Sequence, residues 1–319
     1  MGTRRLLKVC HVNVRSLLAD QRLLDLEIVC ANYSVDVLCV TETWLSPSRV
    51  GSSSRLVQIP GFQPPFRCDR TGGRGGGVAV YVRTGLHVTS VAMLSDLEGV
   101  RVQLHLPQRK NVYIATFYRP PSGGLPLQQF VDRLDSVLTN LPGLPARPLC
   151  LAGDFNAKST VWWSGQASND AGTAFLNLAV DHGLVQLVDG PTRCVSNAKP
   201  SQLDLMFINN VSLVENCAVL PPLADHCPTL LQLQLKFAAA VQQRQSVWDF
   251  DHADWAGLNA FFDQYDWTLV SLCSDVNLAL KSWSDVVQSA LPDFIPQLSS
   301  VVHPRNKPWY SSLLCRIRR

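Results

Sequence analysis

Acidic and polar residues stand inside or at the ends of several short apolar runs of this sequence. A carboxylate at the end of a buried strand is costly unless it is paired or binds a metal. Strand ends in a layered fold tend to converge on one edge, so we predict that these side chains share one site. The residues with this pattern are Asn13, Glu42, Asp154, Asp204, Asp225 and His226.

This set of side chains suits the hydrolysis of a phosphodiester bond. Mg²⁺ prefers a few carboxylate oxygens together with water and a substrate phosphate. We therefore expect Glu42 to bind the metal, with help from Asp225. Asp154 would deprotonate and align the attacking water, and Asn156 would fix the geometry of the reacting phosphorus.

His226 is the remaining candidate for proton transfer. It would act on a leaving or non-bridging phosphate oxygen, and Asp204 would orient its imidazole. The sequence leaves open whether Asp154 or His226 is the principal base, and how many metal ions bind.

Short β-branched runs separated by loops must position these residues, and they dominate the first 236 residues. Apolar residues at helical spacing predict helices over residues 16–31, 128–141 and 171–182. Strands outnumber helices and do not alternate strictly with them, which favours a mixed, layered α/β arrangement over a Rossmann sheet. The expected strands are 7–14, 35–41, 78–82, 100–106, 112–118, 149–152, 203–208 and 230–235.

The composition changes after residue 236, and this change predicts a domain boundary between residues 1–236 and 237–319. Residues 238–245 have the composition of a linker. Residues 276–291 repeat apolar side chains at helical spacing and end at Pro292. We therefore expect residues 237–319 to form a helical connector.

Charge is unevenly distributed along the chain. Residues 1–120 hold 15 Lys and Arg against 8 Asp and Glu, whereas residues 121–236 hold 6 against 9. A basic surface beside an acidic pocket suits a polyanionic substrate such as DNA. The glycine-rich residues 72–77 lack the Lys-Ser/Thr of a phosphate-binding P-loop, and the ten cysteines form no CxxC pair typical of zinc sites.

The motif residues resemble the endonuclease/exonuclease/phosphatase superfamily. Within it they are most similar to the endonuclease domain of non-LTR retrotransposons of the LINE type, broadly the CR1 and jockey-like elements. Eight segments match in the order of the family, between residue 7 and about residue 235. They are His-Val-Asn-Val-Arg-Ser-Leu (11–17), Thr-Glu-Thr-Trp-Leu (41–45), Gly-Gly-Gly-Val-Ala-Val-Tyr (75–81), Phe-Tyr-Arg-Pro-Pro (117–121), Gly-Asp-Phe-Asn-Ala (153–157), Gly-Pro-Thr-Arg (190–193), Ser-Gln-Leu-Asp-Leu (201–205) and Ala-Asp-His (224–226).

The resemblance implies a four-layer α/β sandwich, two mixed β-sheets flanked by helices, and a requirement for Mg²⁺ or Mn²⁺. Repair enzymes of the superfamily usually have Asp where Arg15 stands, so Arg15 removes a ligand of a second metal site. The resemblance also implies roles for individual residues. They are Asn13, Glu42 and Asp225 at the metal, Tyr118 at the scissile phosphate, Asp154, Asn156, Asp204 and His226 in catalysis, and Arg15, Arg119 and Thr192 on DNA.

The function expected from these features is DNA nicking that frees a 3′-hydroxyl for reverse transcription. Residues 248–255 and 307–310 resemble the connector to a reverse transcriptase, and the chain has no Tyr-x-Asp-Asp polymerase motif. Two alternatives remain: abasic-site cleavage or another phosphodiesterase reaction on the same fold, and an inactive retroelement product that only binds nucleic acid. No signal peptide or membrane span is visible, so action on DNA inside the cell, in the nucleus, is expected.

Overall fold

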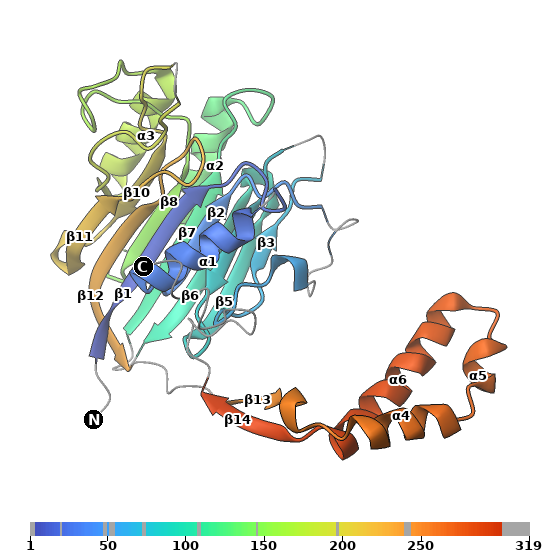
Figure 1. Cartoon of the computed structure of the whole chain (residues 1–319). Helices are drawn as coiled ribbons and strands as arrows, with labels where there is room; N and C mark the ends of the chain where they lie inside the picture. Colours follow the sequence, from blue (N-terminus) through green and yellow to red (C-terminus); the bar gives the residue numbers. More distant parts are fainter. Residues whose placement is uncertain are drawn as a thin grey trace. The chain divides into compact units, whose positions relative to one another are not determined.

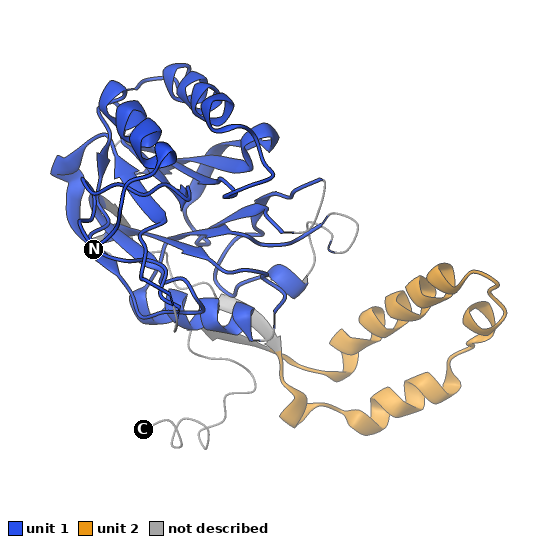
Figure 2. Ribbon diagram, turned by 90° about the horizontal axis from the view of Figure 1, so that it is seen from above, with its two compact units in different colours: residues 1–240 blue, residues 241–319 orange. Residues whose placement is uncertain are grey.

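The chain divides into two compact units, residues 1–240 and residues 241–319 (Figure 2). The computed structural model describes residues 4–19, 21–46, 50, 55–71, 75–106, 110–144, 146–195, 198–238 and 244–301. The predicted boundary at residue 236 lies within strand β12, which continues to Ala238. Of the expected linker at 238–245, residues 239–243 lie outside the described residues, and 244–245 begin another strand.

The first sheet of unit 1 is built around a parallel pair of strands, β1 and β2. Every other pairing in this sheet is antiparallel. In spatial order it contains β11 (Val214–Val219), β12 (Thr229–Ala238), β1 (Arg4–Asn13), β2 (Val37–Thr41), β4 (Val78–Val82) and β3 (Phe66–Cys68).

The second sheet repeats this plan around the parallel pair β7 and β8. Its other pairings are antiparallel as well. In spatial order it contains β5 (His87–Leu94), β6 (Gly99–Leu106), β7 (Lys110–Tyr118), β8 (Leu149–Asp154), β10 (Asp204–Ile208) and β9 (Val185–Gln186).

The two sheets pack face to face, and helices cover their outer faces (Figure 1). One apolar cluster joins the inner faces and includes Val9, Val80 and Ile114. Helix α1 (Arg22–Tyr33) packs through a second cluster on the outer face of the first sheet. Helices α2 (Leu127–Thr139) and α3 (Asp170–Asp181) pack through a third on the second sheet. These layers confirm the predicted sandwich of two mixed sheets flanked by helices.

The predicted helix over residues 16–31 is only partly correct, because α1 begins at Arg22. The preceding turn has left-handed backbone at Arg15, Ser16 and Gln21. Its amides at Ser16 and Leu17 donate to the carbonyls of residues 42 and 43. This long-range pairing replaces the helical hydrogen bonds that the apolar spacing predicted.

The central strands were predicted correctly because layers cover both of their faces, so that they appear in the sequence as unbroken apolar runs. The strands that sequence analysis missed are at edges. β5, for example, has exposed or half-exposed residues throughout, and β3 spans three residues. Without a buried face, such segments lack the apolar alternation that identifies a strand.

Unit 2 contains three helices and a strand pair within residues 244–301. Its elements are β13 (Arg244–Trp248), α4 (Trp255–Gln264), α5 (Thr268–Ser271), α6 (Val276–Phe294) and β14 (Gln297–Val301). Helix α6 continues past Pro292, where sequence analysis ended it, because a proline in the last turn removes only one backbone hydrogen bond. In the described parts of the chain, no helix has the length and apolar character to cross a membrane.

The close pairing of β7 and β8 depends on Gly153. A Cβ at this position would lie 2.1 Å from the carbonyl oxygen of Phe117. We predict that Gly153→Ala destabilises the protein by about 3 kcal/mol or more, because backbone atoms cannot move aside as side chains do. Gly183→Ala is the matched control: its Cβ would meet nothing within 4 Å, and only the positive φ of 61° opposes it, at about 1 kcal/mol.

Urea denaturation of both variants measures the difference in free energy of unfolding. Equal destabilisation by the two substitutions would contradict the tight β7–β8 contact.

Candidate active site

A cleft of about 490 Å³ opens at the end of the sandwich where β2, β7 and β8 finish and β10 begins. It contains eight of the eleven residues proposed from sequence as site residues. They are Arg15, Glu42, Tyr118, Arg119, Asp154, Asn156, Asp225 and His226. Its other lining residues are Pro121, Lys158, Asn169, Arg193, Ser201 and Leu203.

Asn13, at the end of β1, connects carboxylates of the two sheets. Its Nδ2 donates to Glu42 Oε1 at 2.8 Å and to Asp154 Oδ2 at 2.8 Å. Its Oδ1 accepts the amide of Arg15 at 3.1 Å, which fixes the orientation of the side-chain amide. The Asn13 oxygen therefore points away from the carboxylates, and Asn13 positions Glu42. Sequence analysis had instead expected Asn13 to be a metal ligand.

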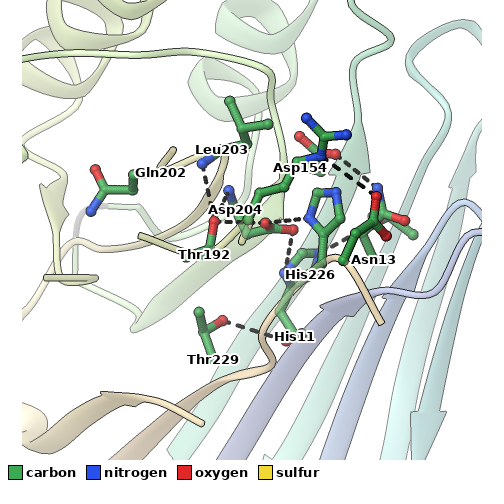
Figure 3. Close-up of polar contacts among 12 residues, drawn as sticks. His11, Asn13, Asp154, Thr192, Gln202, Leu203, Asp204, His226 and Thr229 are labelled. Atoms are coloured by element: carbon green, nitrogen blue, oxygen red, sulfur yellow. Dashed lines mark hydrogen bonds and ion pairs between the residues drawn. The ribbon is translucent and has the colours of Figure 1, made fainter. Parts of the chain in front are cut away.

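A buried group of two aspartates and one histidine lies beside Asn13 (Figure 3). Asp154 and Asp204 are opposite each other in the β8–β10 pair. Ligand atoms of Asp154, Asp204 and His226 all lie within 4.8 Å of one another. His226 Nδ1 is 2.7 Å from Asp204 Oδ2, so Asp204 orients this imidazole, as the sequence predicted. All three residues are at most 3% exposed.

The charges of this group depend on one another. Burial opposes the positive charge of His226, but the negative charge and hydrogen bond of Asp204 outweigh it and raise the pKa of His226 to about 9. Burial also opposes the ionisation of Asp204, yet its contacts with His226 lower the pKa of Asp204. Burial and the neighbouring charge of Asp204 raise the pKa of Asp154 to about 7. At neutral pH, Asp204 and His226 form an ion pair, and Asp154 is poised to exchange a proton.

Asn156 and Arg119 shape the floor of the cleft around Asp154. The backbone N–H of Asn156 donates to Asp154 Oδ1 at 3.1 Å. The side-chain Nδ2 of Asn156 donates to the carbonyl of Arg119 at 2.9 Å. The Arg119 guanidinium donates to the carbonyls of Phe155 and Asn156. Arg119 thus holds the loop after β8. It also lines the cleft, and sequence analysis expected it to contact DNA.

Tyr118 lies next to Asp154 at the ends of the parallel strands β7 and β8. The residue is 5% exposed and lines the cleft. Burial, followed by the negative charges of Glu42 and Asp154, raises the pKa of its hydroxyl. The hydroxyl therefore stays protonated and can donate a hydrogen bond.

Asp225, which sequence analysis expected to help bind the metal, lines the same cleft as Glu42 and Asp154 but is not part of the buried group of Asp154, Asp204 and His226. Its Oδ2 is 3.0 Å from Arg15 Nη1 and 3.6 Å from Arg193 Nε. Two guanidinium groups therefore compensate its charge. Arg15 is half exposed at the rim of the cleft, a suitable place for contact with a polyanion.

Thr192 was expected from the sequence to contact DNA, but it lies inside the protein. Its side chain is fully buried, and its hydroxyl donates to Asp204 Oδ2 at 2.7 Å. The amides of Leu203 and Asp204 in turn donate to this hydroxyl at 3.0 Å. Thr192 orients Asp204 and cannot touch DNA from this position.

Sequence analysis missed Lys158 and Arg193, which add positive charge to the cleft. Lys158 lies two residues beyond Asn156 and Arg193 directly follows Thr192, so adjacency to motif residues was the available signal. It also missed His11, which is fully buried beside Asp204. His11 is two positions before Asn13 in the same strand, and this spacing puts both side chains on one face.

Three residues of the cleft have left-handed backbone: Arg15 at φ 44°, Glu42 at φ 53° and Asn156 at φ 48°. Such conformations cost of order 1 kcal/mol or more outside glycine and persist only where the surroundings impose them. The Glu42 loop is held by the backbone bond from Ser16 to the carbonyl of residue 42. Strained backbone at three residues that line one cleft supports its functional importance.

The family of the chain follows from comparison with known proteins. Residues 10–237 match the Endonuclease/Exonuclease/phosphatase family. The match covers most of unit 1, and the chain therefore belongs to this family. No curated protein sequence is similar enough to the chain to count as a match.

Solved structures with the same fold include nucleases. The endonuclease domain of TRAS1, a telomere-specific non-LTR retrotransposon, has a TM-score of 0.58 at 19% identity and covers 72% of this chain and 99% of its own. The AP endonuclease LMAP from Leishmania major has a TM-score of 0.57 at 19% identity, with coverage of 72% and 88%. The catalytic domain of Xenopus laevis APE2 has a TM-score of 0.55 at 13% identity, with coverage of 74% and 94%. The fold of unit 1 is thus that of these nucleases.

The raised pKa of Asp154 predicts that its charge destabilises the metal-free protein. The carboxyl is ionised above about pH 4 in the unfolded chain but only above about pH 7 in the folded one, so the penalty grows between these values and is complete at pH 8. Asp154→Asn should therefore stabilise the protein by about 4 kcal/mol more at pH 8 than at pH 4, because the variant lacks this penalty. The contact of the new amide with the donor of Asn13 lowers the stability of the variant at both pH values and leaves this difference unchanged.

Urea denaturation at the two pH values, without divalent metal, measures this difference. Asp181→Asn, on the exposed end of α3, is the control and should show none. If Asp154→Asn changed the free energy of unfolding equally at both pH values, a raised pKa at Asp154 would be contradicted.

Proposed function

We propose that the chain is a divalent-metal-dependent endonuclease that hydrolyses phosphodiester bonds of DNA. The observation that carries the proposal is the placement of Glu42, Asp154 and His226 in one cleft with Arg15 and Lys158 at its sides. The acidic groups supply what the hydrolysis of a phosphodiester requires, and the basic side chains suit the phosphates of a nucleic acid.

The donor set fits Mg²⁺ or Mn²⁺. The amide nitrogen of Asn13 lies within hydrogen-bond distance of both Glu42 and Asp154, so two carboxylates face the same space. The only imidazolium of the group already pairs with Asp204, and this leaves negative charge that a hard cation would offset. Glu42 would hold the cation, positioned by Asn13 and by Trp44, whose indole donates to Glu42 Oε2 at 3.0 Å. When bound, the cation would stabilise negative charge on the phosphate and the leaving oxygen.

The side chains divide the remaining chemistry between them. Asp154, with a pKa near 7, accepts a proton from the attacking water, and the backbone bond from Asn156 keeps its second oxygen in place. His226, held protonated by Asp204, donates to a non-bridging phosphate oxygen. The protonated Tyr118 hydroxyl donates to the same phosphate. Water adds to phosphorus, the bond to the 3′-oxygen breaks, and that oxygen leaves as a 3′-hydroxyl after taking up a proton.

We propose further that this nicking serves a non-LTR retrotransposon, with unit 2 leading to a reverse transcriptase. Support comes from the eight motifs in retroelement order, from Arg15 in place of the aspartate of repair enzymes, and from the connector-like residues 248–255. The TRAS1 domain, covered over 99% of its length, is consistent with it. Such a protein would act on chromosomal DNA in the nucleus.

Conversion of supercoiled plasmid to open circles tests the proposed activity. We expect nicking with Mg²⁺ or Mn²⁺ and none after chelation by EDTA. Asp154→Ala and Glu42→Ala should each lower the rate at least about 100-fold. Asp181→Ala, a surface aspartate on α3, should stay within twofold of wild type.

The products and the substrate range separate the alternatives. A 3′-hydroxyl end that primes a DNA polymerase is expected on plasmid without abasic sites. Cleavage restricted to plasmid that carries abasic sites would favour the repair-type reaction instead. Binding of DNA without any nicking would favour an inactive, nucleic-acid-binding product.

A further inference from the structure

A second histidine, His11, lies next to the Asp204 carboxylate (Figure 3). It belongs to β1 and is fully buried. Its Nδ1 is 3.8 Å from Asp204 Oδ1, and neither atom has a hydrogen-bond partner within the described structure. Buried polar atoms without partners are rare because each costs about 1–3 kcal/mol, so this facing pair calls for a reason.

The hydrogen bonds of Asp204 are all on its other oxygen. Oδ2 accepts from Thr192 and from His226, both at 2.7 Å. Oδ1 has no hydrogen-bond partner among the described residues, and His11 Nδ1 lies 3.8 Å from it. No hydrogen bond of the described structure therefore restrains the Oδ1 side of the carboxylate.

The surroundings of His11 determine which ring nitrogen carries the proton. The ring is fully buried, which disfavours its charged form, so it is neutral with a single N–H. Its Nε2 lies 3.3 Å from the Thr41 hydroxyl, which can donate to it. With Nε2 as an acceptor, the proton is on Nδ1 and points at the Asp204 carboxylate, where attraction across 3.8 Å is strong in a buried environment.

We propose that His11 is a positioning residue for the proposed phosphodiesterase reaction: its Nδ1–H fixes the Oδ1 side of Asp204, and thereby the alignment of His226. The inference rests on the proposed function for its catalytic consequence. Its structural part, the Nδ1–H tautomer and its control of His226, stands independently. Such contacts are often long without substrate and shorten in the reacting complex.

The tautomer can be read directly from the full-length protein labelled with ¹⁵N-histidine. The two-bond ¹⁵N–¹H spectrum at pH 7 should show His11 neutral and protonated on Nδ1, assigned by its absence in His11→Asn. Protonation on Nε2, or on both nitrogens, would overturn the proposal whether or not the protein cuts DNA.

A matched pair of variants tests the effect on His226. His11→Asn places an amide donor near the position of Nδ1, whereas His11→Gln places it near Nε2. We expect the ¹⁵N signals of the His226 ring to stay in place in His11→Asn and to shift in His11→Gln. Equal shifts in both variants would overturn the proposal, because they would indicate a general packing role.

Nicking kinetics give the second readout. In His11→Gln we expect kcat to fall about 10- to 100-fold, the range for a partner that orients an active-site group, with KM within twofold of wild type. His11→Asn should recover kcat to within about threefold. Equal losses in both variants would contradict positioning through Nδ1.

The two proposals fail in different ways. A wild-type protein without nicking activity removes the proposed function, yet the tautomer and the His226 signals still decide the role of His11. Full activity in His11→Gln with an unshifted His226 removes the positioning role and leaves the nuclease assignment intact.

Discussion

The burial of two carboxylates with one compensating imidazolium is the constraint on which the rest of the site depends. Asp154 and Asp204 are opposite each other in neighbouring strands and are almost inaccessible to solvent. His226 compensates one of the two charges, and hydrogen bonds from Asn13 and Thr192 stabilise the carboxylates without neutralising them. Burial of charge at this density is unfavourable for folding. It persists in a cleft that would take a cation and a phosphate.

The two-sheet sandwich buries these charged groups together, because the site is divided between its two sheets. The first sheet supplies Asn13 and the loop of Glu42, and the second supplies Tyr118, Asp154 and Asp204. The apolar cluster between the inner faces holds the two halves in register. Packing far from the cleft therefore determines the distance between Glu42 and Asp154, so the stability of the sandwich and the geometry of the site share one structural origin.

Much of this arrangement could be predicted from sequence, and the exceptions have identifiable causes. Asp154 and Glu42 were found because each ends an apolar run that is buried on both faces. The pairing of Asp225 with Arg15, 210 positions away, could not be found, since no local pattern records which surface charges meet. The orienting role of Thr192 was missed for a similar reason: a threonine in a loop gives no sign of the carboxylate that it contacts. Edge strands such as β5 lack the apolar alternation that identifies a strand.

The most direct test of the account is anomalous diffraction from crystals soaked in Mn²⁺. The excess of buried negative charge beside Asn13 predicts an anomalous peak in the cleft adjoining Glu42, and its loss in crystals of Glu42→Gln. An unchanged peak in that variant, or Mn²⁺ bound only outside the cleft, would contradict the claim that these carboxylates form a metal-dependent hydrolytic site.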